Sequence, residues 1–400
     1  MHRTTMAAGA AGGVLGAGLA VLAAGRYAAG AALRTTRDGT GPVPAGFGGP
    51  ALTVHAVTGE QSPGDITLTR SLASRLPGVY GLAGRRCHAV VGPVLPEASV
   101  AAGPGAVVRR LERTGPGGPP AARMRMRLTP AVHAGHPRGV PGAPGAECAD
   151  VEVPGELGPL PTWFVPGERD TWVVAVHGLG TTREQPLNLL PFWRGLRLPV
   201  LLPAYRGDHG APRPRDGFGH LGGSAWRDVD AVVRYAVRRG ARRVVLHGWS
   251  TGAAMALHAA AAPAGGDGTS PEPVALGRVA GLVLDSPVLD PRATVRALAA
   301  ARRVPRPLLP LVVRAAEGRA RLRPDPSGAP PGPPEPRAPV LLVHGPGDVV
   351  APWQASREFA ERYPDLVALH PVEQAPHAAM WNADPEGYEE RLRRFLTPLL

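Results

Sequence analysis

The stretch VVLHGWSTGAAMAL, residues 244–257, decides the fold. A short apolar run leads into a glycine-rich turn around Ser250, and small residues that suit a helix follow. A G-x-S-x-G pattern is weak evidence in a chain with 53 glycines, but a strand before it and a helix after it are typical of a nucleophile elbow. In such a turn the serine sits on a strained bend, and Gly248 and Gly252 leave room for neighbouring backbone.

Further short apolar runs, on both sides of this stretch, predict the rest of a sheet. They alternate with segments of helical periodicity such as 229–237, which indicates parallel strands joined by crossover helices. Continuous apolar runs bounded by turn residues are typical of strands buried on both faces. The runs are residues 172–176, 200–203, 244–247, 281–285, 340–344 and 367–372. We therefore expect an α/β domain over residues 161–400, with a mostly parallel sheet and helices on both faces.

Three more motifs follow predicted strands: HGLG at 177–180, HGPGD at 344–348 and QAPH at 374–377. Because the carboxyl ends of parallel strands meet at one edge of a sheet, we expect these loops to lie beside Ser250. A serine hydroxyl is a poor nucleophile at neutral pH, and it needs a base that is itself oriented by an acid. The loops supply candidates for both.

These motifs, in this order over about residues 160–400, resemble the α/β-hydrolase superfamily, and within it the prolyl-oligopeptidase-like and serine-aminopeptidase-like hydrolases. The resemblance implies that Ser250 is the nucleophile, Asp348 the acid and His377 the base. It also implies an oxyanion hole made by the backbone N–H groups of Leu179 and Thr251, and it implies no metal or organic cofactor. One departure is Pro376, which stands where many relatives carry glycine and is expected to stiffen or displace the histidine loop.

Other residues compete for the same roles. Asp285 ends the strand after the elbow, and some members of the superfamily take their acid from that position; its other interpretation is a bond to neighbouring loop backbone. We interpret His177 and His344 as residues that shape their loops. His209 precedes the nucleophile in the chain, so we interpret it as structural or pocket-lining.

The amino-terminal region predicts a membrane segment. Met6–Gly25 is uncharged and apolar, and it is bounded by Arg3 and Arg26. About twenty residues at roughly 1.5 Å each can cross a hydrocarbon core about 30 Å thick. We therefore expect residues 1–34 to form a single-pass anchor, whose orientation in the membrane the sequence does not determine. The alternative is a signal segment cleaved near residues 29–31.

Two segments separate this region from the α/β domain. Residues 35–50 read as a linker, and residues 51–160 as a β-rich accessory segment packed on, or extending, the catalytic sheet. In residues 123–128 methionine and leucine alternate with arginine, a period of two that indicates a half-buried strand. The accessory segment carries no recognisable chemical motif.

Composition narrows the function classes. The formal charge is +12, but all 44 basic residues are arginine and they are spread along the chain, so nucleic-acid binding is not expected. Cys87 and Cys148 have no metal-ligand spacing, which leaves two free thiols or one disulfide. The sequence therefore predicts a membrane-tethered serine hydrolase that cleaves an ester or amide of a small-molecule or peptide acyl substrate. An aminopeptidase-like enzyme with the same triad and a catalytically idle binding scaffold are the alternatives.

Overall fold

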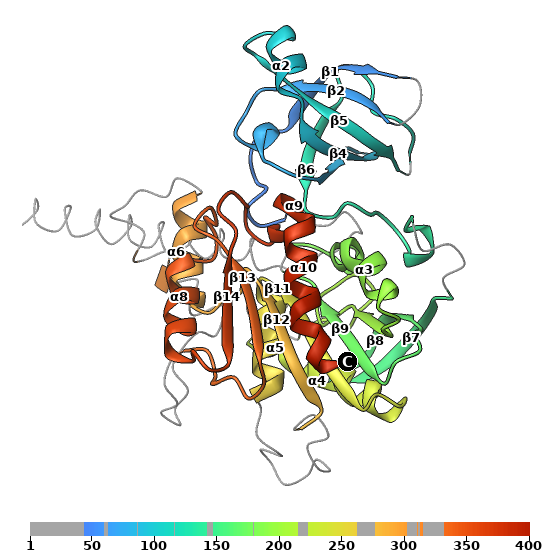
Figure 1. Ribbon diagram of the computed structural model, residues 1–400, viewed down its shortest axis with the longest axis vertical. Helices are drawn as coiled ribbons and strands as arrows, with labels where there is room; N and C mark the ends of the chain where they lie inside the picture. Colours follow the sequence, from blue (N-terminus) through green and yellow to red (C-terminus); the bar gives the residue numbers. More distant parts are fainter. Residues whose placement is uncertain are drawn as a thin grey trace, which may run out of the picture.

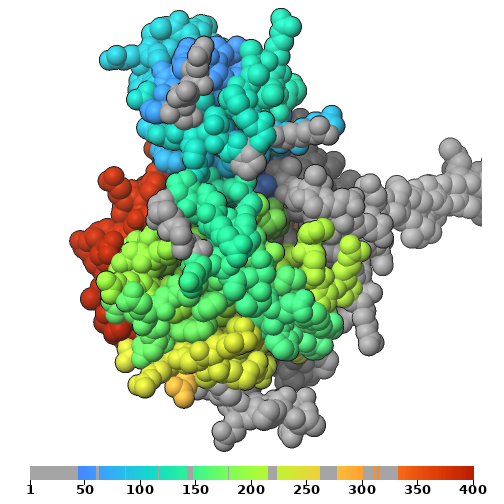
Figure 2. Space-filling view, turned by 90° about the vertical axis from the view of Figure 1, so that its right-hand side faces the viewer, coloured from blue at the N-terminus to red at the C-terminus, as the bar shows by residue number. Residues whose placement is uncertain are grey.

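The computed structural model describes residues 44–59, 63–85, 87–115, 117–141, 147–178, 180–214, 223–261, 277–301, 310, 313–314 and 332–400. They form a small β-barrel above a larger α/β domain, with the carboxyl-terminal helices running along that domain (Figure 1). Figure 2 shows the chain that leaves the barrel passing down over one face of the α/β domain.

The barrel is closed and wholly antiparallel. Its strand order is β1-β2-β5-β4-β3-β6, and β1 closes the circle by pairing with β6 as well as with β2. Alternate side chains such as Ile66, Leu68 and Met126 fill the interior, while Arg125 points outward. The elements are β1 (Leu52–Thr58), β2 (Gly64–Thr69), η1 (Ala73–Arg75), β3 (Tyr80–Ala83), β4 (His88–Val94), α2 (Pro96–Ala101), β5 (Ala106–Thr114) and β6 (Arg125–Thr129). Closure leaves the barrel without a free strand edge.

The α/β domain is built on an eight-stranded sheet in the order β14-β13-β12-β11-β9-β10-β8-β7. The strands from β9 to β14 are parallel, and the β7–β8 hairpin joins antiparallel to β10. The strands are β7 (Ala149–Gly155), β8 (Gly158–Val165), β9 (Thr171–Val176), β10 (Val200–Pro203), β11 (Arg243–Trp249), β12 (Val279–Asp285), β13 (Val340–His344) and β14 (Val367–Pro371). The order reverses between β9 and β11, which is where open α/β sheets place their sites.

Helices cover both faces of this sheet. Val174 and Val176 point into one core, while Val173 and Ala175 point into the other, so β9 is buried on both sides. On the first face lie α4 (Trp226–Arg238), α5 (Thr251–Ala261) and α8 (Trp353–Arg362); on the second lie α3 (Leu190–Gly195) and α10 (Pro385–Leu396). The other elements are η2 (Pro137–Gly139), η3 (Gln185–Leu189), α6 (Pro291–Ala301), α9 (Met380–Ala383) and η5 (Thr397–Leu399).

The predicted sheet is present, but the boundary expected between residues 160 and 161 is wrong. It falls inside β8, because β7 and β8 belong to the large sheet: Val165 of β8 pairs with Val200 of β10. The barrel ends at Thr129, and the accessory segment therefore divides into a barrel and an edge hairpin. Period-two alternation marks a strand without saying which sheet will take it up.

The amino-terminal predictions fall largely outside the described residues. The anchor or signal segment, 1–34, lies wholly there and stays a prediction; within the described part of the chain, no helix has the length and apolarity needed to span a membrane. Of the expected linker, residues 44–50 are described, and Phe47 is buried in the barrel core with its ring 6.2 Å from that of Tyr80. This end of the segment is thus packed onto the barrel.

The two cysteines are free thiols, and the disulfide alternative is not formed. Cys87 is buried in the barrel, where its Sγ donates to the carbonyl of Gly118. Cys148 is buried in the α/β domain, 3.9 Å from Nε2 of His136.

Candidate active site

Ser250 occupies a strained turn between β11 and α5. Its φ is 53°, in the left-handed region that L residues rarely adopt, and its side chain is buried. A Cβ on Gly248 would lie 2.5 Å from the backbone of Ala253, and one on Gly252 would lie 2.2 Å from the carbonyl oxygen of Val176. Both glycines are therefore required by close backbone approach, as the sequence predicts.

Ser250, His377 and Asp348 are hydrogen-bonded in series. Nε2 of His377 lies 2.7 Å from Oγ of Ser250, and Nδ1 lies 2.6 Å from Oδ2 of Asp348. Because an ionised carboxylate only accepts, His377 donates from Nδ1, and its Nε2 then accepts from the serine hydroxyl. The three residues follow β11, β13 and β14, whose carboxyl ends share one edge of the sheet.

Asp348 is held as a carboxylate by a full set of donors. Its Oδ1 accepts from the backbone N–H groups of Val350 and Ala351 at 2.7 and 2.9 Å, and its Oδ2 accepts from His377 and, at 2.9 Å, from Nε2 of His344. Burial raises the pKa of this carboxyl, but the charge and hydrogen bonds of His377 and His344 outweigh burial and hold the pKa well below its usual range. The acid beside His377 is therefore ionised at neutral pH.

The two histidines interpreted as loop-shaping both make buried hydrogen bonds. His344 joins Asp348 to Ser356, whose Oγ lies 2.7 Å from its Nδ1, so it orients the acid rather than replacing the base. His177 lies 2.9 Å from Asp208 and stacks on Tyr205 with ring centroids 4.5 Å apart. Neither histidine is hydrogen-bonded to Ser250.

The competing acid, Asp285, has a different position. Its carboxyl is fully buried, and Oδ1 accepts from the hydroxyl of Ser286 at 2.7 Å. That hydroxyl accepts in turn from the N–H of Ala378, the residue after His377, at 3.0 Å. Burial raises the pKa of Asp285 to about 7, against the smaller opposing effects of the Ser286 bond and of His377. Asp285 is thus linked to the histidine loop through Ser286 and does not bond the imidazole. His209, the other residue considered above, is exposed.

One of the two predicted oxyanion donors can be placed. Thr251 is the first residue of α5, so its N–H belongs to the helix start and has no intrahelical acceptor. Leu179 lies outside the described residues. Its neighbour Gly178 is close against the elbow, because a Cβ there would lie 2.8 Å from the Cβ of Ser250. The loop after β9 therefore touches the turn that carries the serine.

A buried glutamine, Gln185, joins two of these loops, and the sequence did not predict this role. Oε1 of Gln185 accepts from the hydroxyl of Thr181 at 2.7 Å, in the loop after β9. Its Nε2 donates to the carbonyl of Ala378 at 2.8 Å, in the histidine loop. No motif marks this residue, since its partners lie 4 and 193 positions away.

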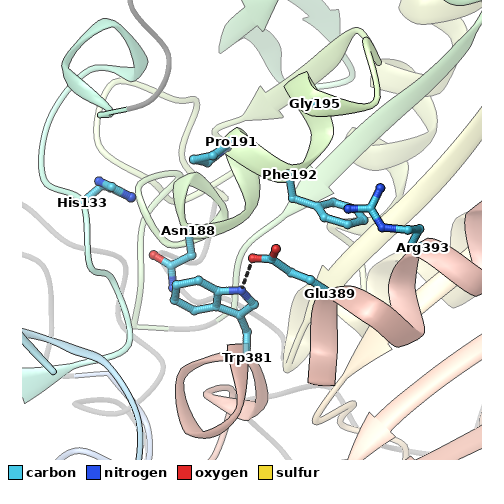
Figure 3. A pocket seen from close by; sticks show the side chains of 8 residues that line it. All are labelled: His133, Asn188, Pro191, Phe192, Gly195, Trp381, Glu389 and Arg393. Atoms are coloured by element: carbon cyan, nitrogen blue, oxygen red, sulfur yellow. Dashed lines mark hydrogen bonds between the residues drawn. The ribbon is translucent and has the colours of Figure 1, made fainter. Parts of the chain in front are cut away.

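A cavity of about 460 Å³ lies between the chain leaving the barrel and the second face of the α/β domain (Figure 3). Its lining includes Trp381, whose indole N–H donates to Glu389 at 3.0 Å, and Arg393, which stacks on Phe192. Ser250, Asp348 and His377 are not among the lining residues, so the cavity is not the place where Ser250 would meet a substrate.

Comparison with solved structures settles the fold. The esterase Pf2001 of Pyrococcus furiosus is 18% identical, with a TM-score of 0.50 over 66% of this chain and 96% of that chain. The chain has the α/β-hydrolase fold. A serine hydrolase without a lid from Xanthomonas campestris, XC6422, is 17% identical over 64% of this chain and 95% of that one, with a TM-score of 0.45. The esterase LipW of Mycobacterium marinum is 25% identical over 62% of this chain and 79% of that one, with a TM-score of 0.42.

The barrel preceding the α/β-hydrolase fold has a match of its own. A family model described as a domain of unknown function (DUF8805) matches residues 53–129, which are the barrel strands almost from end to end. No curated protein matches the chain in sequence.

Proposed function

We propose that this chain is a serine hydrolase that cleaves a carboxylic ester through an acyl-enzyme. The observation that carries the proposal is the unbroken series from the Ser250 hydroxyl through His377 to the Asp348 carboxylate, with separations of 2.7 and 2.6 Å. These separations allow a proton to pass from the hydroxyl to Nε2 without rearrangement.

The first half of the reaction forms the acyl-enzyme. Oγ of Ser250 bonds to the ester carbonyl carbon while Nε2 of His377 takes the hydroxyl proton. The carbonyl π electrons move to oxygen, and the N–H of Thr251, together with the Leu179 amide that the resemblance implies, donates to that oxyanion. Such preorganised donors each contribute about 3–4 kcal/mol to the transition state. The intermediate collapses when the leaving alcohol departs with the proton from Nε2.

The second half repeats the same steps with water. His377 takes a proton from a water molecule, the hydroxide adds to the acyl carbon, and Ser250 leaves with the proton returned by Nε2. Asp348 keeps the imidazole in the tautomer that accepts at Nε2 and stabilises the imidazolium formed in each half. The low pKa of the Asp348 carboxyl suits this role, because the group stays ionised throughout.

Esters are the first substrate class to test, because Pf2001, the solved structure named above with a TM-score of 0.50, is an esterase. The same triad would serve an amide, and the prolyl-oligopeptidase-like and aminopeptidase-like resemblance makes aminoacyl anilides the second class. An idle scaffold that binds a partner is the remaining alternative. Burial of a complete series of hydrogen-bonded polar groups supports the enzyme, since such groups cost stability unless each is satisfied.

The test compares the wild type with Ser250→Ala and with Ser99→Ala, a buried serine in α2 of the barrel. A fluorophosphonate probe should label the wild type and Ser99→Ala but leave Ser250→Ala unlabelled. Turnover of p-nitrophenyl acetate should fall by about 10⁶-fold in Ser250→Ala, in line with other triads. Equal turnover in wild type and Ser250→Ala would rule out the proposal, and a wild type that neither labels nor turns over esters or anilides would favour the scaffold.

A further inference from the structure

The loop that follows His377 is hydrogen-bonded to the barrel through Asn382. This residue lies in α9, is buried, and donates from Nδ2 to the carbonyls of Val79 at 2.8 Å and Pro130 at 2.9 Å. Its backbone carbonyl accepts from the N–H of Val79 at 2.8 Å. Val79 precedes β3 and Pro130 follows β6, so the barrel holds a residue that is only five positions from His377. Figure 1 shows α9 directly beneath the barrel.

On the barrel side, the turn that meets Asn382 is fixed by a buried arginine. Arg109 of β5 is fully buried and donates to the carbonyls of Leu76 and Gly78, each at 2.7 Å, and to Ser74 at 3.2 Å. Its Nε donates to Gly92 at 2.8 Å. Burial lowers the pKa of Arg109 to about 10, which leaves it charged at neutral pH. A charged side chain with four carbonyl acceptors holds this turn in one conformation.

The barrel turn at Gly78 and the loop that follows His377 are in close backbone contact. Gly78 has a φ of +85°, and a Cβ there would lie 1.9 Å from the carbonyl oxygen of Asn382 and 2.7 Å from that of Ala383. Gly103, in the turn between α2 and β5, has a φ of +91° but meets nothing within 4 Å. The two glycines share a backbone conformation and differ in whether they press on the histidine loop.

The segment that precedes the barrel, residues 44–50, reaches His377 itself. Gly46 lies against the imidazole-bearing residue, because a Cβ on Gly46 would be 2.9 Å from the Cβ of His377. The next residue, Phe47, is buried in the barrel core, and Ala379 packs against the same core from the loop. The barrel therefore contacts the loop at Ala379 and at Asn382, and the segment packed on the barrel contacts the loop at His377.

We propose that the barrel, residues 52–129, is a positioning domain for the base: through Gly78, Arg109 and Asn382 it holds His377 in hydrogen-bonding distance of Ser250. The inference rests on the proposed function of the triad. It assigns a role to the region that matches the domain of unknown function, and it makes Asn382 a positioning residue rather than a catalytic one. A displacement of about 1 Å in a reacting group can cost about 100-fold in rate.

The first experiment compares Gly78→Ala with Gly103→Ala. Both place alanine at positive φ in the barrel, so their backbone strain is matched, but only Gly78→Ala pushes on Asn382. We expect kcat for p-nitrophenyl acetate to fall about 10- to 100-fold in Gly78→Ala with KM within about twofold, and kcat in Gly103→Ala to stay near wild type. Equal kcat in the two variants, with both barrels folded, would overturn the proposal.

A second pair covers the case in which Gly78→Ala does not fold. Asn188 and Asn382 both donate to the carbonyl of Pro130, but Asn188 lies in η3 and not in the histidine loop. Asn188→Ala and Asn382→Ala should lose similar thermal stability, and only Asn382→Ala should lose kcat. A similar loss of kcat in both would show a general effect of loosening the barrel, and the proposal would fall.

A spectroscopic readout separates this proposal from the proposed function. The proton shared by Nδ1 of His377 and Asp348 should give a far-downfield proton NMR signal, assigned by its loss in His377→Gln. It should shift or broaden in Gly78→Ala and Asn382→Ala and persist in the two control variants, whether or not the wild type hydrolyses esters. An inactive wild type with that pattern would reject the enzyme and keep the positioning role; an unchanged signal in all four variants would reject the positioning role.

Discussion

Asp348 and His344 are joined by a hydrogen bond of 2.9 Å between Oδ2 and Nε2. The same oxygen accepts from His377, so one carboxylate oxygen receives two imidazoles while Oδ1 receives two backbone amides. The carboxylate of Asp348 is therefore fixed in orientation. Its two oxygens have different partners and cannot exchange places without breaking these hydrogen bonds.

This fixed orientation predicts a strong effect of Asp348→Asn. The amides of Val350 and Ala351 need an acceptor, so the new carboxamide should keep its oxygen on their side and turn its NH₂ toward His377. His377 would then accept at Nδ1 and carry its proton on Nε2, where it cannot take one from Ser250. We expect kcat to fall about 10⁴-fold with the fold retained. Asp365→Asn, on an exposed residue, is the control, and an active Asp348→Asn variant would contradict the assignment of the acid.

Gln185 should matter for rate more than for binding. Gln185→Met keeps a side chain of similar length but loses the bonds to Thr181 and to Ala378, so the two loops can move relative to each other. We expect kcat to fall about tenfold with a smaller change in KM. Steady-state kinetics beside the exposed Gln354→Met would check this; matching kcat values for both variants would mean that the bridge has no part in positioning.

The elbow should not tolerate a methyl group. In Gly248→Ala the added carbon would lie 2.5 Å from the backbone of Ala253, and backbone cannot give way as a side-chain end can. We expect a loss of about 1–3 kcal/mol in the free energy of unfolding, together with loss of activity. Gly139→Ala, where nothing lies within 4 Å, should change neither in urea titrations and ester assays. An active, fully stable Gly248→Ala would refute the close approach.

Asp285 predicts a pH dependence of stability. Its pKa is about 7 in the folded protein and its ordinary value is 3.8, so the folded state binds more protons between these values. Stability from this group is therefore greatest at low pH within that range, declines as pH rises from about 4 to about 7, and is lost above it. Asp285→Asn mimics the protonated acid, so its free energy of unfolding relative to wild type should be higher at pH 8 than at pH 5, by a few kcal/mol. Urea unfolding at both pH values would check this, and a constant difference would count against it.

The sheet and the position of the site were accessible from sequence because their signals are local. The runs 200–203 and 340–344 coincide with β10 and β13, and Ser250, Asp348 and His377 follow the strands expected. Ser250, Asp348 and His377 could be brought together on paper because parallel strands send their carboxyl ends to one edge. The joining of their side chains in series was an expectation from resemblance.

What could not be predicted depends on contacts between distant parts of the chain. No motif marks Arg109 in the sequence, yet its side chain is fully buried and donates to four carbonyls of other segments. Asn382 and Gln185 carry no motif, and their partners are set by how the barrel meets the loop. β7 and the first residues of β8 were assigned to the accessory segment because alternation looks the same in a barrel and at a sheet edge.

The bond between Asn382 and Val79 spans 303 positions, and this has a consequence for synthesis. The barrel strands precede α9 in the chain, so the barrel leaves the ribosome before the segment that it holds. Domains that emerge early fold early, so a finished barrel waits until its partner segment has been made. The imidazole can thus be held in its working position only after α9 has been translated, and a nascent chain that has not reached Asn382 should be inert.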